Sequence, residues 1–421
     1  MSTFSKQVTW TFATRVLMIF NSVVAGIIVA WWLGAEGVGQ LAVINVTVAT
    51  IVQLGSFGLP SANTYFIAQD QEQIRTAAIN SLIFALVIGS ILALSVSTLA
   101  SFRPDFFGFV SPTLIRIASI SIPFQLIALI GLNILLAAGK LKQFNLLDLA
   151  GQSFVLINAL LALIVFNRGL ETLVTLNTAA SVVVSIVIAV LLVVVARTLQ
   201  TSHWRADLAL LRRMIGYGIK FHVSILALAI ILRADLLVVN HFRGAAEAGV
   251  YSVASQFAMM LMLLPGVTAT LLFPRVTAEQ DARGETTCRV TRQTTLIMFF
   301  CCLAAVPFSL LLPVMYGPEF RDATLLLLIL LPGVYLISLE SVLVQHFNAL
   351  GLPVAIPLYW IVTLVVNLIL VFALVPRFGA QGAAIASTIS YAAIFALVAR
   401  HFHTSTRRSF AEVFVRGSLR G

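Results

Sequence analysis

Charged side chains are scarce in this sequence of 421 residues. Asp, Glu, Lys and Arg make up 10% of it, apolar residues make up 60%, and the mean hydropathy is +1.03. A soluble domain usually carries about 25% charged residues, because its surface must face water. The composition therefore excludes an ordinary soluble protein and indicates an integral membrane protein.

Cysteines and catalytic side-chain patterns are also sparse. Of the three cysteines, Cys288 stands alone, while Cys301 and Cys302 are adjacent and cannot bridge each other on a helix. The apolar runs contain no paired carboxylates and no His-x-x-Glu cluster, and the chain has no Gly-x-x-x-x-Gly-Lys-Ser/Thr motif for a nucleotide. We therefore expect free thiols, no metal, no cofactor and no enzymatic activity.

What the sequence has instead is a series of long apolar runs. A helix needs about 20 apolar residues to cross the hydrocarbon core, and a spanning chain must pair its backbone groups internally. Runs of that length occur at 8–33, 40–65, 77–102, 113–138, 143–166, 170–196, 219–242, 249–275, 291–315, 323–349, 353–375 and 379–401. The predicted fold class is an all-α integral membrane protein with twelve transmembrane helices.

Glycines recur in the two halves of the chain at a spacing of about 210 residues, which indicates a duplication. The matched positions are Gly39 with Gly249, Gly139 with Gly351, and Gly169 with Gly379. Because each half holds six spans, both halves enter the membrane in the same orientation, and the pseudo-twofold axis runs along the membrane normal. We expect a central cavity between the lobes, outward-facing turns at Gly39 and Gly249, and cytoplasmic turns at Gly139 and Gly351.

The spacing of the runs also predicts the domain boundaries. We expect an N-terminal lobe at 1–200, a cytoplasmic inter-lobe segment at 201–218, a C-terminal lobe at 219–402 and a basic cytoplasmic tail at 403–421. Within the inter-lobe segment, 204–214 has apolar residues at helical spacing beside a basic face. This pattern is typical of a helix that lies on the anionic inner leaflet.

Basic residues between the spans predict the orientation in the membrane. Of the 26 Lys and Arg, Arg233 lies within a span and six lie on the side opposite the N-terminus: Arg103, Arg116, Arg168, Arg243, Arg321 and Arg377. All the others fall on the N-terminal side. Both termini are therefore expected in the cytoplasm, and this bias accounts for the net charge of +10 without a nucleic-acid partner.

Polar side chains inside the spans are candidates for a binding site, because a charge at the centre of a span costs about 2.5–3.5 kcal/mol. At 100° per residue, His222, Arg233 and Asn240 share one face of the seventh span. Arg15 in the first span either faces a cavity or extends to the membrane surface. Asn45 and Asn63 lie on a polar face of the second span. These six residues are the substrate-binding candidates.

Two acids complete the set of candidate residues. Asp235 lies on the opposite face of the seventh span from Arg233, and Glu340 points away from the other polar residues of the tenth span. Each is either a site for a coupling ion or proton, or a partner for a neighbouring helix.

Three segments together resemble a known family. They are 33–42 after the first span, 233–235 followed by 249–254, and 376–384 before the last span. In order and spacing they resemble the polysaccharide-export group of the MOP flippase superfamily, the Wzx-type oligosaccharide flippases, and this similarity implies the MATE/MOP-like fold. It implies a flippase of the bacterial inner membrane that moves an undecaprenyl-pyrophosphate-linked oligosaccharide outward by alternating access for surface polysaccharide assembly. Its partners would be membrane lipids, the polysaccharide polymerase and other assembly proteins.

The residues agree with the sign of that substrate, because an arginine in a low-dielectric cavity suits a pyrophosphate. Two other functions stay open. A cation-coupled multidrug and toxin extrusion antiporter would share the architecture, but it would need acids in the cavity, and neither of the first two runs contains an Asp or Glu at membrane depth. A membrane scaffold for a polysaccharide-synthesising complex would use the surface of the protein instead of its cavity.

Overall fold

The computed structural model describes residues 3–198, 205–279, 281, 283–351 and 353–415, and every regular element in these ranges is helical. The elements of the first half are α1 (Thr3–Gly55), α2 (Leu59–Gln69), η1 (Gln71–Gln73), α3 (Ile74–Phe102), η2 (Pro104–Phe107), α4 (Pro112–Ser119), α5 (Ser121–Ala137), α6 (Leu141–Ala159), η3 (Leu160–Val165), α7 (Leu170–Thr198) and α8 (Leu208–Ile231). Those of the second half are α9 (Ala234–Arg243), α10 (Ala245–Leu261), α11 (Leu263–Glu279), α12 (Glu285–Ser309), α13 (Leu312–Tyr316), η4 (Pro318–Phe320), α14 (Arg321–Leu350), α15 (Ala355–Thr406) and α16 (Phe410–Phe414).

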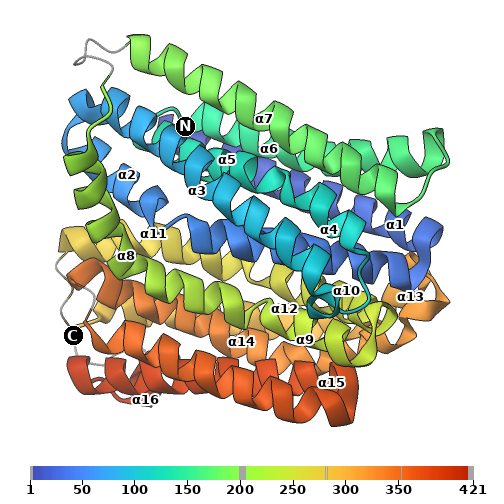
Figure 1. Cartoon of the computed structure of the whole chain (residues 1–421). Coiled ribbons are helices and arrows are strands. Elements are labelled where there is room, and N and C mark those ends of the chain that lie inside the picture. Colours follow the sequence, from blue (N-terminus) through green and yellow to red (C-terminus); the bar gives the residue numbers. More distant parts are fainter. Residues whose placement is uncertain (1–2, 199–204, 280, 282, 352, 416–421) are drawn as a thin grey trace. The chain divides into compact units, whose positions relative to one another are not determined.

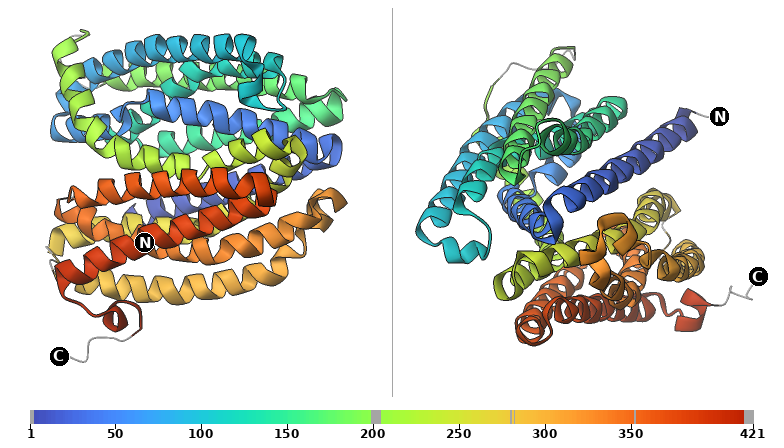
Figure 2. Two further views of the ribbon diagram at one scale, coloured as in Figure 1. Left: turned by 60° about the horizontal axis from the view of Figure 1, so that its bottom comes forward. Right: turned by 90° about the vertical axis from the view of Figure 1, so that its right-hand side faces the viewer.

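Ten helical stretches of the described residues are long and apolar enough to cross a membrane. Two of them, Trp10–Gly55 and Ala355–Thr406, contain one glycine in a non-helical conformation, Gly34 (φ 67°, ψ −173°) and Gly379 (φ 60°, ψ −140°). Positive φ is readily available only to glycine, so the chain turns there. Figure 2 shows α15 doubling back on itself. Each of these two stretches supplies two spans, which gives the multi-pass layout of twelve helices predicted from the sequence.

Two of the glycines expected to form turns lie inside helices instead. Gly39 lies inside α1 and Gly249 lies inside α10, so the expectation of turns at these positions is wrong. The turns are five residues earlier, at Gly34 and Gly244, where φ is 67° and 96°. The spacing of the repeat is the same for both pairs, but only the glycines with positive φ reverse the chain. Gly139 (φ 72°) and Gly351 (φ 112°) do lie between helices.

Two predicted spans are interrupted. The second stops at Gly55 and resumes at Leu59, with Phe57 (φ 47°) and Gly58 (φ 74°) in the turn between. The seventh stops at the end of α8 and resumes at α9. A hydropathy pattern does not detect such breaks, because the residues around them continue the apolar run.

Contacts between residues divide the chain into two compact units. Unit 1 comprises Met1–Ala229 and Gly244–Ala246, and unit 2 comprises Ile230–Arg243 and Glu247–Gly421. In unit 1, α5 packs against α2, α3 and α7, and α6 packs against α1 and α7 (Figure 1). In unit 2, α14 packs against α11, α12 and α15, and α9 packs against α15.

A contact between two glycines holds α8 against the start of α2 in unit 1. A Cβ atom added to Gly58 would lie 2.3 Å from the carbonyl oxygen of Gly218, and one added to Gly218 would lie 2.5 Å from that of Gly58. Beside this contact the rings of Tyr65 and Tyr217 stack, with their centroids 4.2 Å apart and 17° between the planes. The two backbones therefore touch directly, and no larger residue fits at either position.

Unit 2 has a polar clamp around the turn in α15. Glu247 at the start of α10 accepts a hydrogen bond through Oε1 from the backbone N–H of Ala380, at 2.6 Å. Arg243 at the end of α9 donates from Nη2 to the carbonyl oxygen of Arg377, at 3.2 Å. Side chains from α9 and α10 thus bind both sides of the turn at Gly379.

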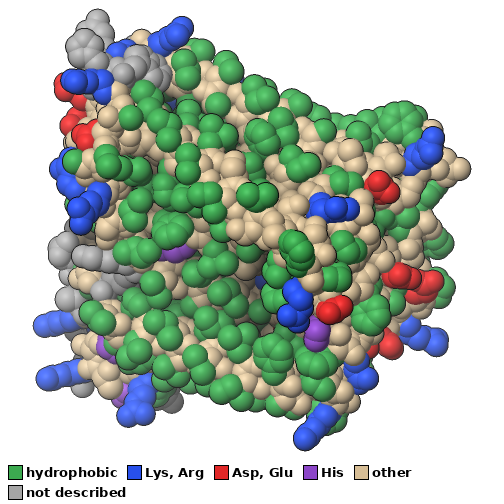
Figure 3. Space-filling view, in the orientation of Figure 1, with side chains coloured by type: hydrophobic (Ala, Val, Ile, Leu, Met, Phe, Trp, Pro, Cys, Tyr) green, Lys and Arg blue, Asp and Glu red, His purple; other side chains and the backbone are tan. Residues whose placement is uncertain are grey.

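The surface agrees with a protein that spans the bilayer. Figure 3 shows hydrophobic side chains over the middle of the helices, with most of the visible Lys, Arg, Asp and Glu near the helix ends. Large apolar side chains of the spans are open to the surroundings: Leu94 in α3 is 70% exposed and Ile369 in α15 is 63% exposed. Lipid tails can cover such side chains, whereas water would not stabilise them.

The predicted surface helix at 204–214 is not a separate element. Residue 204 lies outside the described residues, and 208–214 forms the first part of α8, which continues into the seventh span. In the tail, α16 begins with a capping box in which Ser409 and Glu412 bond each other's backbone N–H groups. Arg292 of α12 donates to the carbonyl oxygen of Glu412, so this part of the tail is attached to unit 2.

Candidate functional site

An ion pair joins the first span to α6. Nη1 of Arg15 lies 2.8 Å from Oδ2 of Asp148, and the two side chains are 36% and 22% exposed. The guanidinium also lies over the ring of Phe144, 6.0 Å from its centroid. Arg15 therefore neither extends alone to the membrane surface nor points alone into a cavity, because α6 supplies its counter-charge.

Two hydrogen bonds flank this ion pair along the same pair of helices. Asn145 donates from Nδ2 to Oγ1 of Thr11 at 2.8 Å, and Asn21 donates from Nδ2 to Oγ of Ser153 at 3.0 Å. The first span thus uses Thr11, Arg15 and Asn21 to bind α6. In a bilayer such polar contacts substitute for the apolar driving force that helices lack in lipid.

Sequence reasoning missed Asp148. It lies within the predicted span 143–166, where an acid is as costly as an arginine. The sequence therefore contains the signal, but pairing Asp148 with Arg15 needs the contact between two spans that are more than 130 residues apart.

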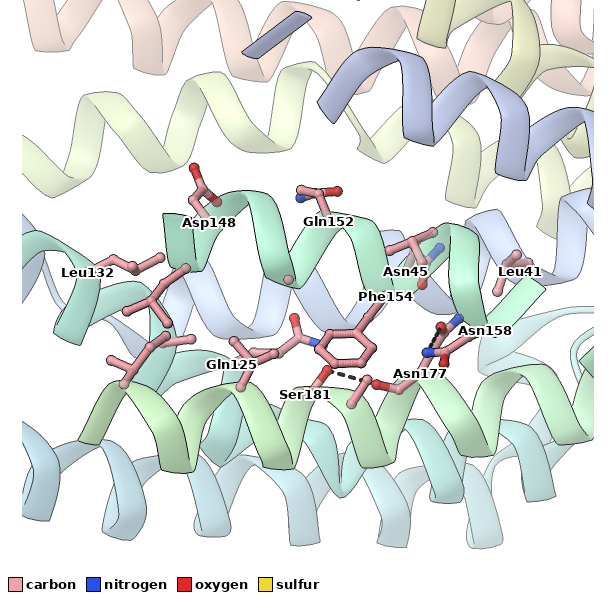
Figure 4. Close-up of a pocket in the computed structure, with 17 residues that line it drawn as sticks. Leu41, Asn45, Gln125, Leu132, Asp148, Gln152, Phe154, Asn158, Asn177 and Ser181 are labelled. Atoms are coloured by element: carbon pink, nitrogen blue, oxygen red, sulfur yellow. Dashed lines mark hydrogen bonds between the residues drawn. The ribbon is translucent and has the colours of Figure 1, made fainter. Parts of the chain in front are cut away.

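A pocket of about 300 Å³ with both polar and apolar lining residues lies within unit 1, between α1, α5, α6 and α7 (Figure 4), at the lower end of the size range of small-molecule sites. Its polar lining residues are Asn45, Gln125, Asp148, Gln152, Asn158, Asn177 and Ser181. In Figure 4, Gln125, Phe154 and Ser181 turn toward one another between α6 and α7, while Asp148 and Gln152 lie on the other side of α6. The ion pair thus borders the pocket.

Hydrogen bonds hold part of the pocket lining in place. Asn158 donates from Nδ2 to Oδ1 of Asn177 at 2.9 Å, and Ser181 donates to the backbone oxygen of Asn177 at 3.0 Å (Figure 4). Gln125 donates from Nε2 to Oγ of Ser121 at 3.0 Å, which leaves its amide oxygen available. These contacts fix the side chains but leave both donors and acceptors for a ligand.

Asn45 is the predicted binding residue that the structure places in this pocket, whereas Asn63 lies outside its lining. Asn63 is fully buried and donates from Nδ2 to Oγ of Ser81 at 3.0 Å, which ties α2 to α3. The sequence predicts both asparagines on one face of one span. The break at Ser56–Gly58 places them on different helices, α1 and α2, so that expectation is wrong.

The common face predicted for the seventh span is also wrong, because the helix is interrupted. His222 is buried in α8 and belongs to unit 1. Arg233 is exposed in the turn between α8 and α9, and Asn240 is buried in α9; both belong to unit 2. A periodicity of 100° per residue applies only within one continuous helix.

Asp235 is held by neighbours in unit 2. It is 3% exposed, and its Oδ2 accepts hydrogen bonds from the hydroxyl of Tyr251 and from Oγ of Ser387, the latter at 2.8 Å. The backbone N–H of Leu236 donates to its Oδ1 at 2.7 Å. This acid therefore joins α9, α10 and α15, as expected of a helix-packing partner.

Glu340 is the other predicted acid, and it is 2% exposed in α14. Its Oε1 has no hydrogen-bond partner among the described residues. Burial of a carboxyl group without partners is costly, so this acid is a candidate for a protonated group or for a site that a ligand completes.

Comparison with known proteins supports a transporter fold. The lipid II flippase MurJ in an inward closed conformation aligns with 95% of this chain and 90% of its own at a TM-score of 0.75 and 15% identity. An inward-facing MATE family transporter of the MOP superfamily aligns with 96% of this chain and 99% of its own, at a TM-score of 0.74 and 16% identity. At this identity the similarity shows the fold alone.

Sequence relatives carry names from glycan export. A putative O-antigen transporter of Shigella flexneri is 25% identical over 184 residues, which is 42% of this chain and 44% of the relative. A probable low-salt glycan biosynthesis flippase of Haloferax volcanii is 26% identical over 166 residues, 38% of this chain and 35% of the relative. The chain thus matches less than half of the length of these relatives.

A family model described as "Polysaccharide biosynthesis protein" matches residues 28–325, well over half of the chain. The resemblance to the polysaccharide-export group of the MOP flippase superfamily is thereby confirmed, and this multi-pass membrane protein belongs to the polysaccharide biosynthesis protein family.

Proposed function

We propose that this protein is a flippase that moves a lipid-linked oligosaccharide across the bacterial inner membrane for polysaccharide assembly. The observation that carries the proposal is a pocket with several polar side chains, bordered by an ion pair, inside the helices of a multi-pass member of this family. Polar groups are costly in a bilayer, so a pocket lined by several of them indicates a polar cargo.

The charges suit a substrate with a pyrophosphate. A guanidinium has five N–H donors in a fork that matches phosphate oxygens, and the ion pair with Asp148 occupies only part of the Arg15 fork. Arg233, exposed in the break of the seventh span, is the second candidate for a phosphate contact. Moving negative charge outward is favoured by the membrane potential, by about 2.3 kcal/mol per charge per 100 mV.

Several features belong to the same proposal. The protein would act by alternating access of the lobes 1–200 and 219–402, as a transporter and not as an enzyme. Both termini would lie in the cytoplasm, as the distribution of Lys and Arg predicts. The undecaprenyl carrier would stay in the surrounding lipids, and the polysaccharide polymerase would use the oligosaccharide after its transfer.

A multidrug antiporter is the second candidate, since the fold is shared with MATE transporters. Such a protein needs a free acid in its pocket to bind a cation. Asp148 is the acid of the pocket lining, but Arg15 already neutralises it. The geometry of the pocket therefore favours the flippase.

The test is genetic. In a deletion strain, lipid-linked oligosaccharide should accumulate on the cytoplasmic side and surface polysaccharide should be lost. The wild-type gene should restore both, and the Arg15→Ala variant should restore them poorly at equal protein level, because it loses the phosphate contact. A deletion strain with normal polysaccharide and new sensitivity to cationic dyes would contradict the flippase and support the antiporter.

A further inference from the structure

The pocket of unit 1 has a chemistry more specific than a general polar cavity. Among the described residues that line it, Asp148 is the charged one, and its partner Arg15 balances that charge. A cation or an anion entering the pocket would therefore find no net countercharge. The ligand that fits is uncharged.

The uncharged polar groups of the lining are mostly carboxamides. An amide offers two N–H donors and an acceptor oxygen, and a sugar hydroxyl both donates and accepts, so the two groups complement each other. Gln125 and Ser181 lie on the side of α6 that faces α7, and in the described part of the chain the amide oxygen of Gln125 and the hydroxyl oxygen of Ser181 accept no hydrogen bond. They are free to bind a ligand without breaking a contact of the protein.

One aromatic ring and one glycine complete the site. Phe154 turns into the space between α6 and α7, beside Gln125 and Ser181 (Figure 4). Nearly one turn of α6 away, Gly151 has no side chain, and a Cβ added there would meet its nearest neighbour, Val184, only at 3.9 Å. An apolar ring face next to several amides complements both kinds of surface that a sugar ring presents, its C–H face and its hydroxyl rim.

We propose that this pocket binds an uncharged sugar ring of the oligosaccharide, with the ring face on Phe154 and its hydroxyl groups on Gln125 and Ser181. This inference rests on the proposed function and goes beyond it. It separates the binding of the glycan, in the pocket, from the binding of the pyrophosphate, for which the candidates Arg15 and Arg233 lie outside the pocket lining.

The experiment uses the glycan that the cell itself makes. Lipid-linked oligosaccharide is extracted from the deletion strain, and mild acid releases its glycan. The glycan is then labelled with a fluorophore at its reducing end and titrated against the full-length protein in nanodiscs. We expect Gln125→Ala and Phe154→Ala each to weaken binding about fivefold to tenfold, as the loss of one uncharged contact implies. Gln143→Ala is the matched control, since Gln143 lies on α6 with Phe154 but outside the pocket lining, and this variant should bind as wild type does.

Competitors distinguish the chemistry of the site. Excess inorganic pyrophosphate should not displace the labelled glycan, and neither should the cationic dye rhodamine 6G. Displacement by either, wild-type binding by both pocket variants, or no binding of the glycan at all would overturn the sugar site. If the deletion strain accumulates no lipid-linked oligosaccharide, the proposed function itself fails, so the two failures can be told apart.

Discussion

At the scale of single residues, the sequence indicates which side chains are unusual but not what they contact. Arg15 stands out as a costly charge in a span, yet its partner Asp148 cannot be assigned from the sequence, because the two residues belong to spans far apart in the chain. The sequence makes Asp235 and Asn63 candidates for coupling or substrate roles, and the structure gives both of them hydrogen bonds to neighbouring helices. Polarity in a span thus signals a polar contact, and only the packing shows whether a ligand takes part.

The Arg15–Asp148 ion pair predicts a measurable coupling between the two side chains. Arg15→Ala and Asp148→Ala should each lower the thermal stability of the purified protein, and the double variant should be less unstable than the sum of the two. Because both side chains are partly exposed, we expect a coupling free energy of about 1 kcal/mol or less. The measurement is a double-mutant cycle on thermal unfolding. Strictly additive effects would show that the two charges do not interact.

At the scale of elements, the number and length of the helices follow from hydropathy, but their breaks do not. The interruption at Phe57–Gly58 and the turn at Gly379 depend on backbone conformations with positive φ. The sequence does not distinguish Gly379 from Gly39 and Gly216. Of these three glycines, only Gly379 has a positive φ. Whether a glycine forms a turn or a close contact depends on the part of the chain that packs against it, and a sequence alone does not contain that information.

The Gly58–Gly218 contact gives a prediction for α2 and α8. Gly218→Ala should destabilise the protein by about 2 kcal/mol, because the new methyl group would overlap the backbone of Gly58. Gly216→Ala, two residues away with no atom within 4 Å of its added Cβ, should be neutral or stabilising by up to about 1 kcal/mol, since alanine favours a helix. Thermal unfolding of the two variants tests this, and equal stabilities would exclude a direct contact of the backbones.

The clamp on α15 gives a second prediction for an element. Gly379→Ala should cost about 3 kcal/mol, because its φ and ψ suit glycine alone and its added Cβ would overlap Oε1 of Glu247. Gly169→Ala is the control, since it is the matched glycine of the repeat and its added Cβ meets no atom within 4 Å. Protein yield and thermal stability should fall for the first variant only. A stable Gly379→Ala protein would contradict the clamp.

At the scale of the whole molecule, composition and hydropathy are sufficient for the fold class. They indicate a membrane protein of twelve helices, and the resemblance of three short segments points to the correct family. The repeat of glycines leads to the wrong turn residues, Gly39 and Gly249 instead of Gly34 and Gly244. The pocket of unit 1 does not follow from the sequence, because it needs residues of four helices to converge.

The distribution of Lys and Arg predicts the orientation of the protein. In a variant without its native cysteines, Ser111→Cys before α4 should react with a membrane-impermeant maleimide in intact spheroplasts, because that segment is expected on the periplasmic side. Ser405→Cys near the end of α15 should react only after the membrane is permeabilised. The reverse labelling pattern would show that the orientation is inverted.

The contact of Gly58 with Gly218 also has a consequence for biosynthesis. A chain leaves the ribosome from its N-terminus, so α1 to α7 are made before α8 exists. Until residue 218 has been synthesised, the turn at Gly58 has no backbone against it and Tyr65 lacks the ring of Tyr217 on which it stacks. Unit 1 therefore cannot complete its packing from the first six spans alone, and its folding must wait for translation to enter the second half of the chain.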